Sequence, residues 1–350
     1  IFMIINYTSM KQNKSKKKAS IFRKLLVKIC RVFGYELVGQ SNLEFPSSNK
    51  NYEDGISLPG VKSFSLGLGS TKITRKINYL DIIVKTCTGV QLVTQSKKRI
   101  FEKNKSEYTF RSINSLYNSA AELKKNYSSI NIRFTFIDAG SNQEDLKKIK
   151  SLNNSHKFET NYIKIDPINA KNLSRTINKN NKEIETNMAM TMSSIRESFI
   201  FGVDCEDLIY FVEDDYIHEA GALTEMVLSY EKFSSIIEEE LFLLSTDYPY
   251  LYKKAENTSV VIGEKYHWRT VKESLLTFMT SKKMITKHYK ELIQMATYEN
   301  NPFEKNLHQI YEKELCFSPV PSLSIHCTNV NSIFGISPNI DLKKIWDQNK

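Results

Sequence analysis

From residue 80 onward, short apolar runs alternate with longer stretches whose apolar residues recur at helical spacing. An alternation of this kind is typical of stacked βα units, which build a largely parallel sheet with helices on its faces. We therefore predict an α/β, Rossmann-like domain over residues 80–350, with a mostly parallel central sheet flanked by helices. The apolar runs cover residues 80–87, 132–137, 162–165, 208–212 and 241–244, and helical patterns cover 108–125 and 187–201.

Residues 1–79 lack this alternation, and we expect a basic amphipathic helix followed by an irregular linker or arm. Within residues 19–34, apolar side chains recur every three or four residues, and basic residues occupy much of the remaining surface. The apolar positions are Phe22, Leu25, Leu26, Ile29 and Phe33, and the basic ones are Arg23, Lys24, Lys28 and Arg31. Two interpretations stay open: the helix packs on the main domain, or it associates peripherally with the inner face of a membrane.

The formal net charge of +10 comes mostly from lysines scattered along the chain. No nucleic-acid recognition motif accompanies this charge, so we expect no nucleic acid among the partners. The five cysteines include no CxxC pair, which is typical of free thiols in a reducing compartment. No apolar run reaches the length of a membrane span. We therefore expect a cytoplasmic protein.

Three consecutive carboxylates, Glu213, Asp214 and Asp215, directly follow the apolar run Leu208–Val212. An unbroken apolar run indicates a central strand buried on both faces, and open α/β sheets bind ligands at the carboxyl ends of their strands. Carboxylates this close repel one another, and burial would raise their pKa values unless a cation compensates. Mn²⁺ or Mg²⁺ would compensate, because hard cations favour oxygen ligands. The alternative is an acidic turn that caps the next helix.

The order of these elements resembles the GT-A glycosyltransferases, particularly their family-2-like members. The residues that carry the resemblance are a strand ending in IDAGS at 137–141, a polar insert, a helix, and IYFVEDDYI at 209–217. The resemblance covers roughly residues 80–327 and implies a GT-A-like fold. The sequence departs from the family in two places: the motif is EDD rather than a strict DxD, and the second strand lacks the paired acidic residues often found there.

In the GT-A fold, an Asp after the second strand contacts the nucleotide, and a DxD-type motif after the fourth strand holds a metal that bridges the donor diphosphate. The resemblance therefore implies that Asp138 binds the nucleotide and that Asp215 is a direct ligand of Mn²⁺ or Mg²⁺. It also implies that Glu213 and Asp214 contact the ribose or a metal-bound water. His326, at the end of a short predicted strand, is similar in position to a late histidine that many members supply as a further metal ligand. A lone histidine is more often structural.

Four further residues are candidates for chemistry or for sugar binding. Asp247 follows the fifth apolar run, where GT-A enzymes line the acceptor cleft, and it is our candidate general base for the acceptor hydroxyl. Glu273 is the second candidate base. In the charged, aromatic segment 266–270, Arg269 could neutralise the diphosphate and Trp268 could form the floor under the sugar.

Together these features predict a metal-dependent, hexosyltransferase-type glycosyltransferase with a nucleotide-sugar donor. The resemblance to family-2-like members favours inversion with a carboxylate base. The acceptor, whether a glycan, a lipid-linked molecule or a protein, is not predicted. One alternative is a SAM-dependent methyltransferase, because residues 136–142, with the loop Asp138–Gly140, resemble the cofactor loop of that class without its second glycine. A non-catalytic binding module would leave the acidic triplet and His326 unexplained.

Overall fold

The structure is a computed structural model that describes residues 21–35, 72–89, 101, 103–166, 170, 184, 186–253, 258–298, 302–327 and 340–350. These residues belong to two compact units. One unit contains residues 1–75 and 231–239, and the larger one contains residues 76–230 and 240–350. Most of the predicted linker before residue 79 lies outside the described residues, and the predicted domain boundary there stays a prediction.

The predicted amphipathic helix is confirmed as α1 (Ile21–Val32). The chain leaves it at Gly34, whose φ is +79°, in the left-handed region that glycine enters without strain. Tyr35 N then donates to Cys30 O at 2.8 Å, which satisfies a carbonyl of the last turn. Within the described parts of the chain, no helix is long and apolar enough to cross a membrane.

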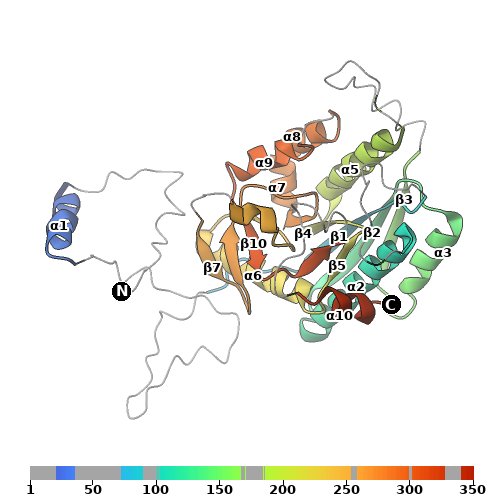
Figure 1. The fold of residues 1–350 in the computed structure, drawn as a ribbon, viewed down its shortest axis with the longest axis horizontal. Coiled ribbons are helices and arrows are strands. Elements are labelled where there is room, and N and C mark those ends of the chain that lie inside the picture. The colour runs from blue at the N-terminus through green and yellow to red at the C-terminus, as the bar shows by residue number, and fades with distance from the viewer. Residues whose placement is uncertain are drawn as a thin grey trace, which may run out of the picture. The chain divides into compact units, whose positions relative to one another are not determined.

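The larger unit is built on a sheet that has nine strands in the described residues, in the order β3-β2-β1-β4-β9-β6-β10-β8-β7 (Figure 1). The strands β3, β2, β1 and β4 run parallel to one another. β9 lies antiparallel between β4 and β6, while β10 is parallel to β6. β8 is antiparallel to β10, and β7 to β8. The strands are β1 (Tyr79–Thr86), β2 (Asn131–Asp138), β3 (Glu159–Lys164), β4 (Leu208–Glu213), β6 (Phe242–Leu243), β7 (Val260–Ile262), β8 (His267–Thr270), β9 (Phe278–Ser281) and β10 (Cys316–Val320).

Helices cover both faces of this sheet, so the predicted α/β fold with a mostly parallel central sheet is confirmed. In Figure 1, α5, α7, α8 and α9 lie on one side of the sheet, and α2 and α10 lie on the other. The helices are α2 (Lys105–Asn126), α3 (Gln143–Leu152), α5 (Thr186–Asp204), α6 (Ala222–Ile237), α7 (Lys282–Lys287), α8 (Tyr289–Met295), α9 (Lys305–Tyr311) and α10 (Leu342–Gln348), with a 3₁₀ helix, η5, at Pro249–Lys253.

β4 is the buried central strand that the apolar run predicts. It lies between β1 and β9, and each residue from Leu208 to Val212 is at most 2% exposed. The run is unbroken because both faces of the strand are covered, which removes the polar alternation of a half-exposed strand. The acidic triplet therefore follows directly on a strand that is covered on both faces.

Some elements differ from the sequence-based expectations. The helix α3 is unpredicted, because Ile149 is the residue that it buries and one position sets no clear periodicity. The third strand covers Glu159–Lys164 instead of 162–165. The short strand predicted to end at His326 is present as β11 (Ser324–His326). Its partner β5 (Tyr216–His218) is unpredicted, because three residues are too short to show a pattern. Since β5 follows the triplet directly, the triplet does not cap a helix.

Candidate functional site

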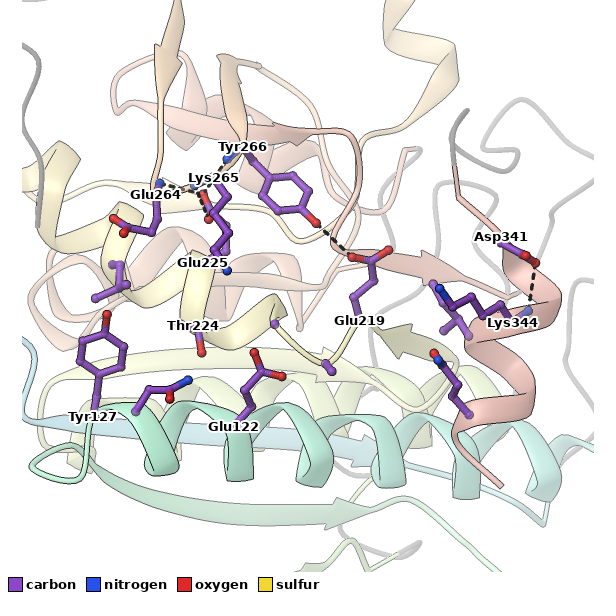
Figure 2. A pocket seen from close by; sticks show the side chains of 16 residues that line it. Glu122, Tyr127, Glu219, Thr224, Glu225, Glu264, Lys265, Tyr266, Asp341 and Lys344 are labelled. Atoms are coloured by element: carbon purple, nitrogen blue, oxygen red, sulfur yellow. Dashed lines mark hydrogen bonds between the residues drawn. The ribbon is translucent and has the colours of Figure 1, made fainter. Parts of the chain in front are cut away.

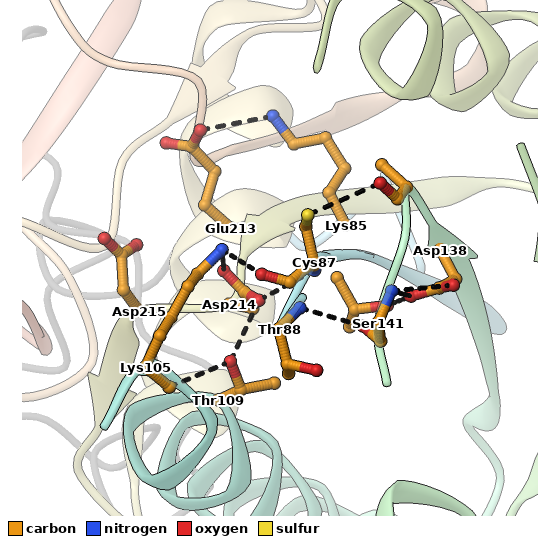
Figure 3. Close-up of polar contacts among 12 residues, drawn as sticks. Lys85, Cys87, Thr88, Lys105, Thr109, Asp138, Ser141, Glu213, Asp214 and Asp215 are labelled. Atoms are coloured by element: carbon orange, nitrogen blue, oxygen red, sulfur yellow. Dashed lines mark hydrogen bonds and ion pairs between the residues drawn. The ribbon is translucent and has the colours of Figure 1, made fainter. Parts of the chain in front are cut away.

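Polar side chains from three strands meet at the carboxyl edge of the sheet (Figure 3). In the strand register, Thr86 pairs with Asp138, and Lys85 pairs with Glu213. Because β2, β1 and β4 are adjacent and parallel, residues at their ends lie side by side. The sheet thus brings the IDAGS loop and the acidic triplet to one place, as the sequence predicts for a ligand site.

Asp138 is 5% exposed and binds its own loop. Its carboxylate accepts hydrogen bonds from Thr86 Oγ1 at 3.2 Å, Ser141 N at 3.1 Å and Gly140 N at 3.4 Å. Gly140 has a φ of +115°, which favours glycine there. Asp138 therefore shapes the loop beside β1, and a contact with nucleotide would have to use its remaining lone pairs.

Asp214 points inward and joins three segments of the chain (Figure 3). Its Oδ2 accepts hydrogen bonds from Cys87 N at 3.1 Å and Thr109 Oγ1 at 2.9 Å. Its Oδ1 lies 3.6 Å from Lys105 Nζ, which also donates to Cys87 O. We call Cys87, Lys105, Thr109 and Asp214 the Asp214 cluster. It ties the end of β4 to the end of β1 and to the first turn of α2.

Charge balance keeps Lys105 protonated inside this cluster. Burial lowers the pKa of its ammonium, but the nearby Asp214, Cys87 and Asp215 raise it, and the net pKa lies above the usual value. A buried ammonium with a carboxylate beside it is stabilised as an ion pair. Sequence inspection missed Lys105 and Thr109, because nothing in a helical pattern shows that a first-turn residue faces a distant strand end.

Asp215 points away from the Asp214 cluster and pairs with His326. Its Oδ2 lies 3.2 Å from His326 Nε2. The two meet because β11 runs antiparallel to β5, with His326 opposite Tyr216 and Cys327 N donating to Asp215 O at 2.8 Å. The His326 ring also stacks on Tyr216, with centroids 4.6 Å apart. The structure thus brings together the two residues that the sequence analysis assigned to a metal.

The Asp215–His326 pair has the spacing of two neighbouring ligands. Two oxygen or nitrogen atoms bound at right angles to an ion at about 2.1 Å lie about 3 Å apart, close to the observed 3.2 Å. In the described part of the chain, no group of three or more His, Cys, Asp or Glu could hold a metal. Mg²⁺ commonly binds one or two protein ligands together with substrate phosphates. The pair therefore fits an ion whose coordination a diphosphate completes.

His326 is buried among acidic groups. Burial lowers the pKa of its imidazole, but Asp215, Glu213 and Glu304 raise it, so the net pKa lies above the usual value. Its Nδ1 is buried without a hydrogen-bond partner in the described residues. A cation is thus favoured next to Asp215, and a proton on Nε2 would compete with a metal ion for that position.

Glu304 is a further acidic residue that sequence inspection missed. It immediately precedes α9. Burial, with a smaller contribution from Glu213, raises the pKa of its carboxyl to about 7, and Lys85 and His326 oppose the rise. Glu213 in turn pairs with Lys85, whose Nζ lies 3.4 Å from Glu213 Oε1. Glu304 lies in a polar segment away from any predicted strand end, so no pattern marks it.

Asp247 and Arg269 neutralise each other in the interior. Asp247 is 1% exposed, and its Oδ1 accepts hydrogen bonds from Arg269 Nε at 3.2 Å and Nη2 at 2.8 Å. Its Oδ2 accepts one from Tyr252 Oη, and the guanidinium lies 4.2 Å from the centre of the Tyr252 ring. The predicted base and the predicted diphosphate ligand are thus engaged with one another, and either role would require this pair to open.

Trp268 lies on β8, and Glu273 lies three residues beyond its end. Trp268 is fully buried, and its Nε1 donates to Glu225 Oε1 at 3.1 Å, so its ring has no exposed face for a sugar. Glu273 is half-buried and lies between β8 and β9. Thr277 directly precedes β9, and its Oγ1 accepts a hydrogen bond from Glu213 N at 3.2 Å.

A separate cavity of about 580 Å³ opens between α2, the start of α6, the β7–β8 turn and α10 (Figure 2). None of the nine residues predicted for the site lines it. The buried Glu225 forms part of its wall and accepts hydrogen bonds from the backbone N–H groups of Glu264 at 3.0 Å and Lys265 at 2.8 Å. Its role here is to hold the β7–β8 turn.

No known protein family matches this sequence, and no curated protein matches it either. Among solved structures, the chain is similar to the galactosyltransferase LgtC in complex with donor and acceptor sugar analogs, at 12% identity and a TM-score of 0.31, over 62% of this chain and 64% of LgtC. It is also similar to mouse xyloside xylosyltransferase 1, at 9% identity and a TM-score of 0.34, over 67% and 76% of the two chains. A third is core-mannan synthase A from Aspergillus fumigatus in its Mn/GDP form, at 11% identity and a TM-score of 0.24, over 53% and 48%.

The first two structures are glycosyltransferases by name, and the chain spans less than two thirds of the length of LgtC. TM-scores this low do not establish a function, and the resemblance to family-2-like members stays a prediction. The function has to be argued from the site itself.

Proposed function

We propose that this chain is a glycosyltransferase that takes a sugar from a nucleotide-diphosphate donor, with Mn²⁺ or Mg²⁺ at Asp215 and His326. The observation that carries the proposal is the meeting of these two side chains, 3.2 Å apart, directly after the buried strand β4. Ligands of open α/β sheets bind at this edge. A carboxylate beside an imidazole suits a divalent ion that also binds phosphate.

The residues around Asp215 and His326 would each have a separate role in donor binding. A bound ion would neutralise the diphosphate and stabilise it as a leaving group. Asp215 Oδ2 and His326 Nε2 would hold the ion, and the Asp214 cluster would keep the strand end in place. The Lys85 ammonium, paired with Glu213 at the same edge, would attract the phosphates of the donor. Asp138 would shape the loop beside which the nucleotide lies.

For the acceptor, we propose inversion with a carboxylate that takes the hydroxyl proton. Glu304 is the stronger candidate, because its raised pKa of about 7 suits proton transfer near neutral pH. Asp247 could act as the base after its bonds to Arg269 and Tyr252 have opened, and Glu273 is the remaining candidate base. The donor sugar, hexose or other, is left to a donor-panel assay with released nucleotide as the readout.

The decisive experiment measures nucleotide binding by isothermal titration calorimetry with UDP, GDP and SAM, each with and without Mn²⁺. We expect one nucleoside diphosphate to bind only with Mn²⁺, and Asp215→Asn to weaken that binding more than tenfold, because it removes a charged ligand. The matched control is Asp347→Asn on α10, whose carboxylate is about half exposed (48%) and should leave affinity unchanged.

Two results would reject the proposal. Binding of SAM without metal would favour the methyltransferase. Absence of binding to every nucleotide, from a protein with an intact melting transition, would favour a non-catalytic module.

A further inference from the structure

The helix α1 separates its apolar side chains from its basic ones. Around a helix of 3.6 residues per turn, Phe22, Leu25, Leu26 and Ile29 fall on one face, and the following Phe33 continues it. Arg23, Lys24, Lys28 and Arg31 fall on the rest of the circumference, by their positions in the sequence. A helix of 12 residues is marginally stable in water by itself, so it needs a surface that buries its apolar face.

The apolar face carries large side chains with much of their area accessible. Phe22 is 75% exposed, Leu25 55% and Ile29 47%. The helix ends in a turn at Gly34, so the apolar face is only about three helical turns long and forms one compact patch. A patch of large aliphatic and aromatic side chains is typical of helices that insert shallowly between lipid headgroups.

The charge of residues 1–35 indicates which kind of surface α1 binds. Residues 1–35 contain nine lysines and arginines and no aspartate or glutamate. A helix that packs on a protein domain gains little from such one-sided charge, whereas a surface of anionic lipid attracts every one of these residues. Apolar insertion and charge attraction then act on the same helix, and together they give stable but reversible binding.

We propose that α1 binds anionic membranes, lying in the plane of the headgroups with its Phe22–Leu25–Ile29 face toward the acyl chains. This interaction does not depend on the proposed glycosyl transfer. Each basic residue near an anionic surface contributes enough to change the partition coefficient about fivefold. Loss of two large apolar side chains should reduce it at least tenfold.

The test is vesicle co-flotation of the full chain with phosphatidylcholine vesicles that contain or lack phosphatidylglycerol. The wild type should float with the anionic vesicles and not with the neutral ones. Leu25→Gln combined with Ile29→Gln should abolish flotation, since glutamine keeps the helix propensity but removes apolar area. The matched control is Val27→Gln, because residue 27 falls on the opposite side of the helix and should float like the wild type.

Three outcomes would overturn the proposal: no flotation of the wild type with anionic vesicles, equal flotation with neutral ones, or equal loss in the Val27→Gln control. A lower melting temperature of the Leu25→Gln, Ile29→Gln variant without vesicles would also count against it, because it would show that α1 packs on the protein itself.

Discussion

Replacing Asp214 with asparagine tests whether this residue positions the site or binds the donor. The resemblance to GT-A enzymes assigns Asp214 to the ribose or to a metal-bound water. The structure instead shows its carboxylate between Cys87 N, Thr109 Oγ1 and Lys105 Nζ. The Asp214→Asn substitution would keep the size of the side chain but would place an uncharged amide beside the buried Lys105 ammonium.

The size of the effect follows from the burial of this pair. The side chains of Lys105 and Asp214 are 15% and 10% exposed. Removing one partner of a fully buried pair costs about 3–5 kcal/mol, because the remaining charge is left without compensation. The long separation of 3.6 Å and the partial exposure place Asp214→Asn below that range, at about 2–3 kcal/mol of unfolding free energy. In a unit of this size that lowers the melting temperature by about 4–5 °C.

The assay is urea unfolding of four proteins: wild type, Asp214→Asn, Lys105→Met and the double variant. If the pair is coupled as described, the double variant should lose at least about 1 kcal/mol less than the sum of the single losses. The control is Asp347→Asn, whose exposed pair with Lys350 (3.7 Å) should contribute less than about 0.5 kcal/mol. An Asp214→Asn protein as stable as the wild type, yet unable to bind nucleotide, would refute this reasoning and support direct contact with the donor.

Three further results are expected. Glu225→Gln should lower the free energy of unfolding by about 3 kcal/mol, because the new NH₂ group would face a backbone N–H whose hydrogen bond the carboxylate now accepts. The control is Glu122→Gln: Glu122 lines the same cavity without a hydrogen bond in the described residues, and its replacement should change the free energy of unfolding by less than about 0.5 kcal/mol. Gly89→Ala should lower the melting temperature, because its Cβ would lie 2.2 Å from Gly140 O, and an unchanged melting curve would contradict this close approach. Glu304→Gln should have little effect on the stability of the protein at pH 4.5 and should stabilise it by up to about 3 kcal/mol at pH 8. The reason is that the pKa of Glu304 is raised to about 7 in the folded protein, so the stability of the wild type falls as the pH rises from about 4.5 through 7. Equal effects of the substitution at both pH values would contradict the raised pKa.

The sequence by itself determined the elements whose pattern is local. The unbroken apolar run of Leu208–Val212 predicted a strand buried on both faces, and the triplet at its end predicted where ligands would gather. The alternation from residue 80 predicted the α/β sheet, and the spacing from Phe22 to Phe33 predicted α1. Periodicity suffices for these features because it records which sides of a single element are apolar.

The tertiary structure decided how three adjacent carboxylates differ. Asp214 turns to Lys105 and Thr109, Asp215 turns to His326, and Glu213 turns to Lys85. Each partner lies on another strand or helix, and the contact between Asp215 and His326 depends on a strand pair of three residues a side. The sequence does not distinguish a carboxylate that is buried in an ion pair from one that is available to a ligand. Its role is set by burial and by neighbours that only the folded chain brings together.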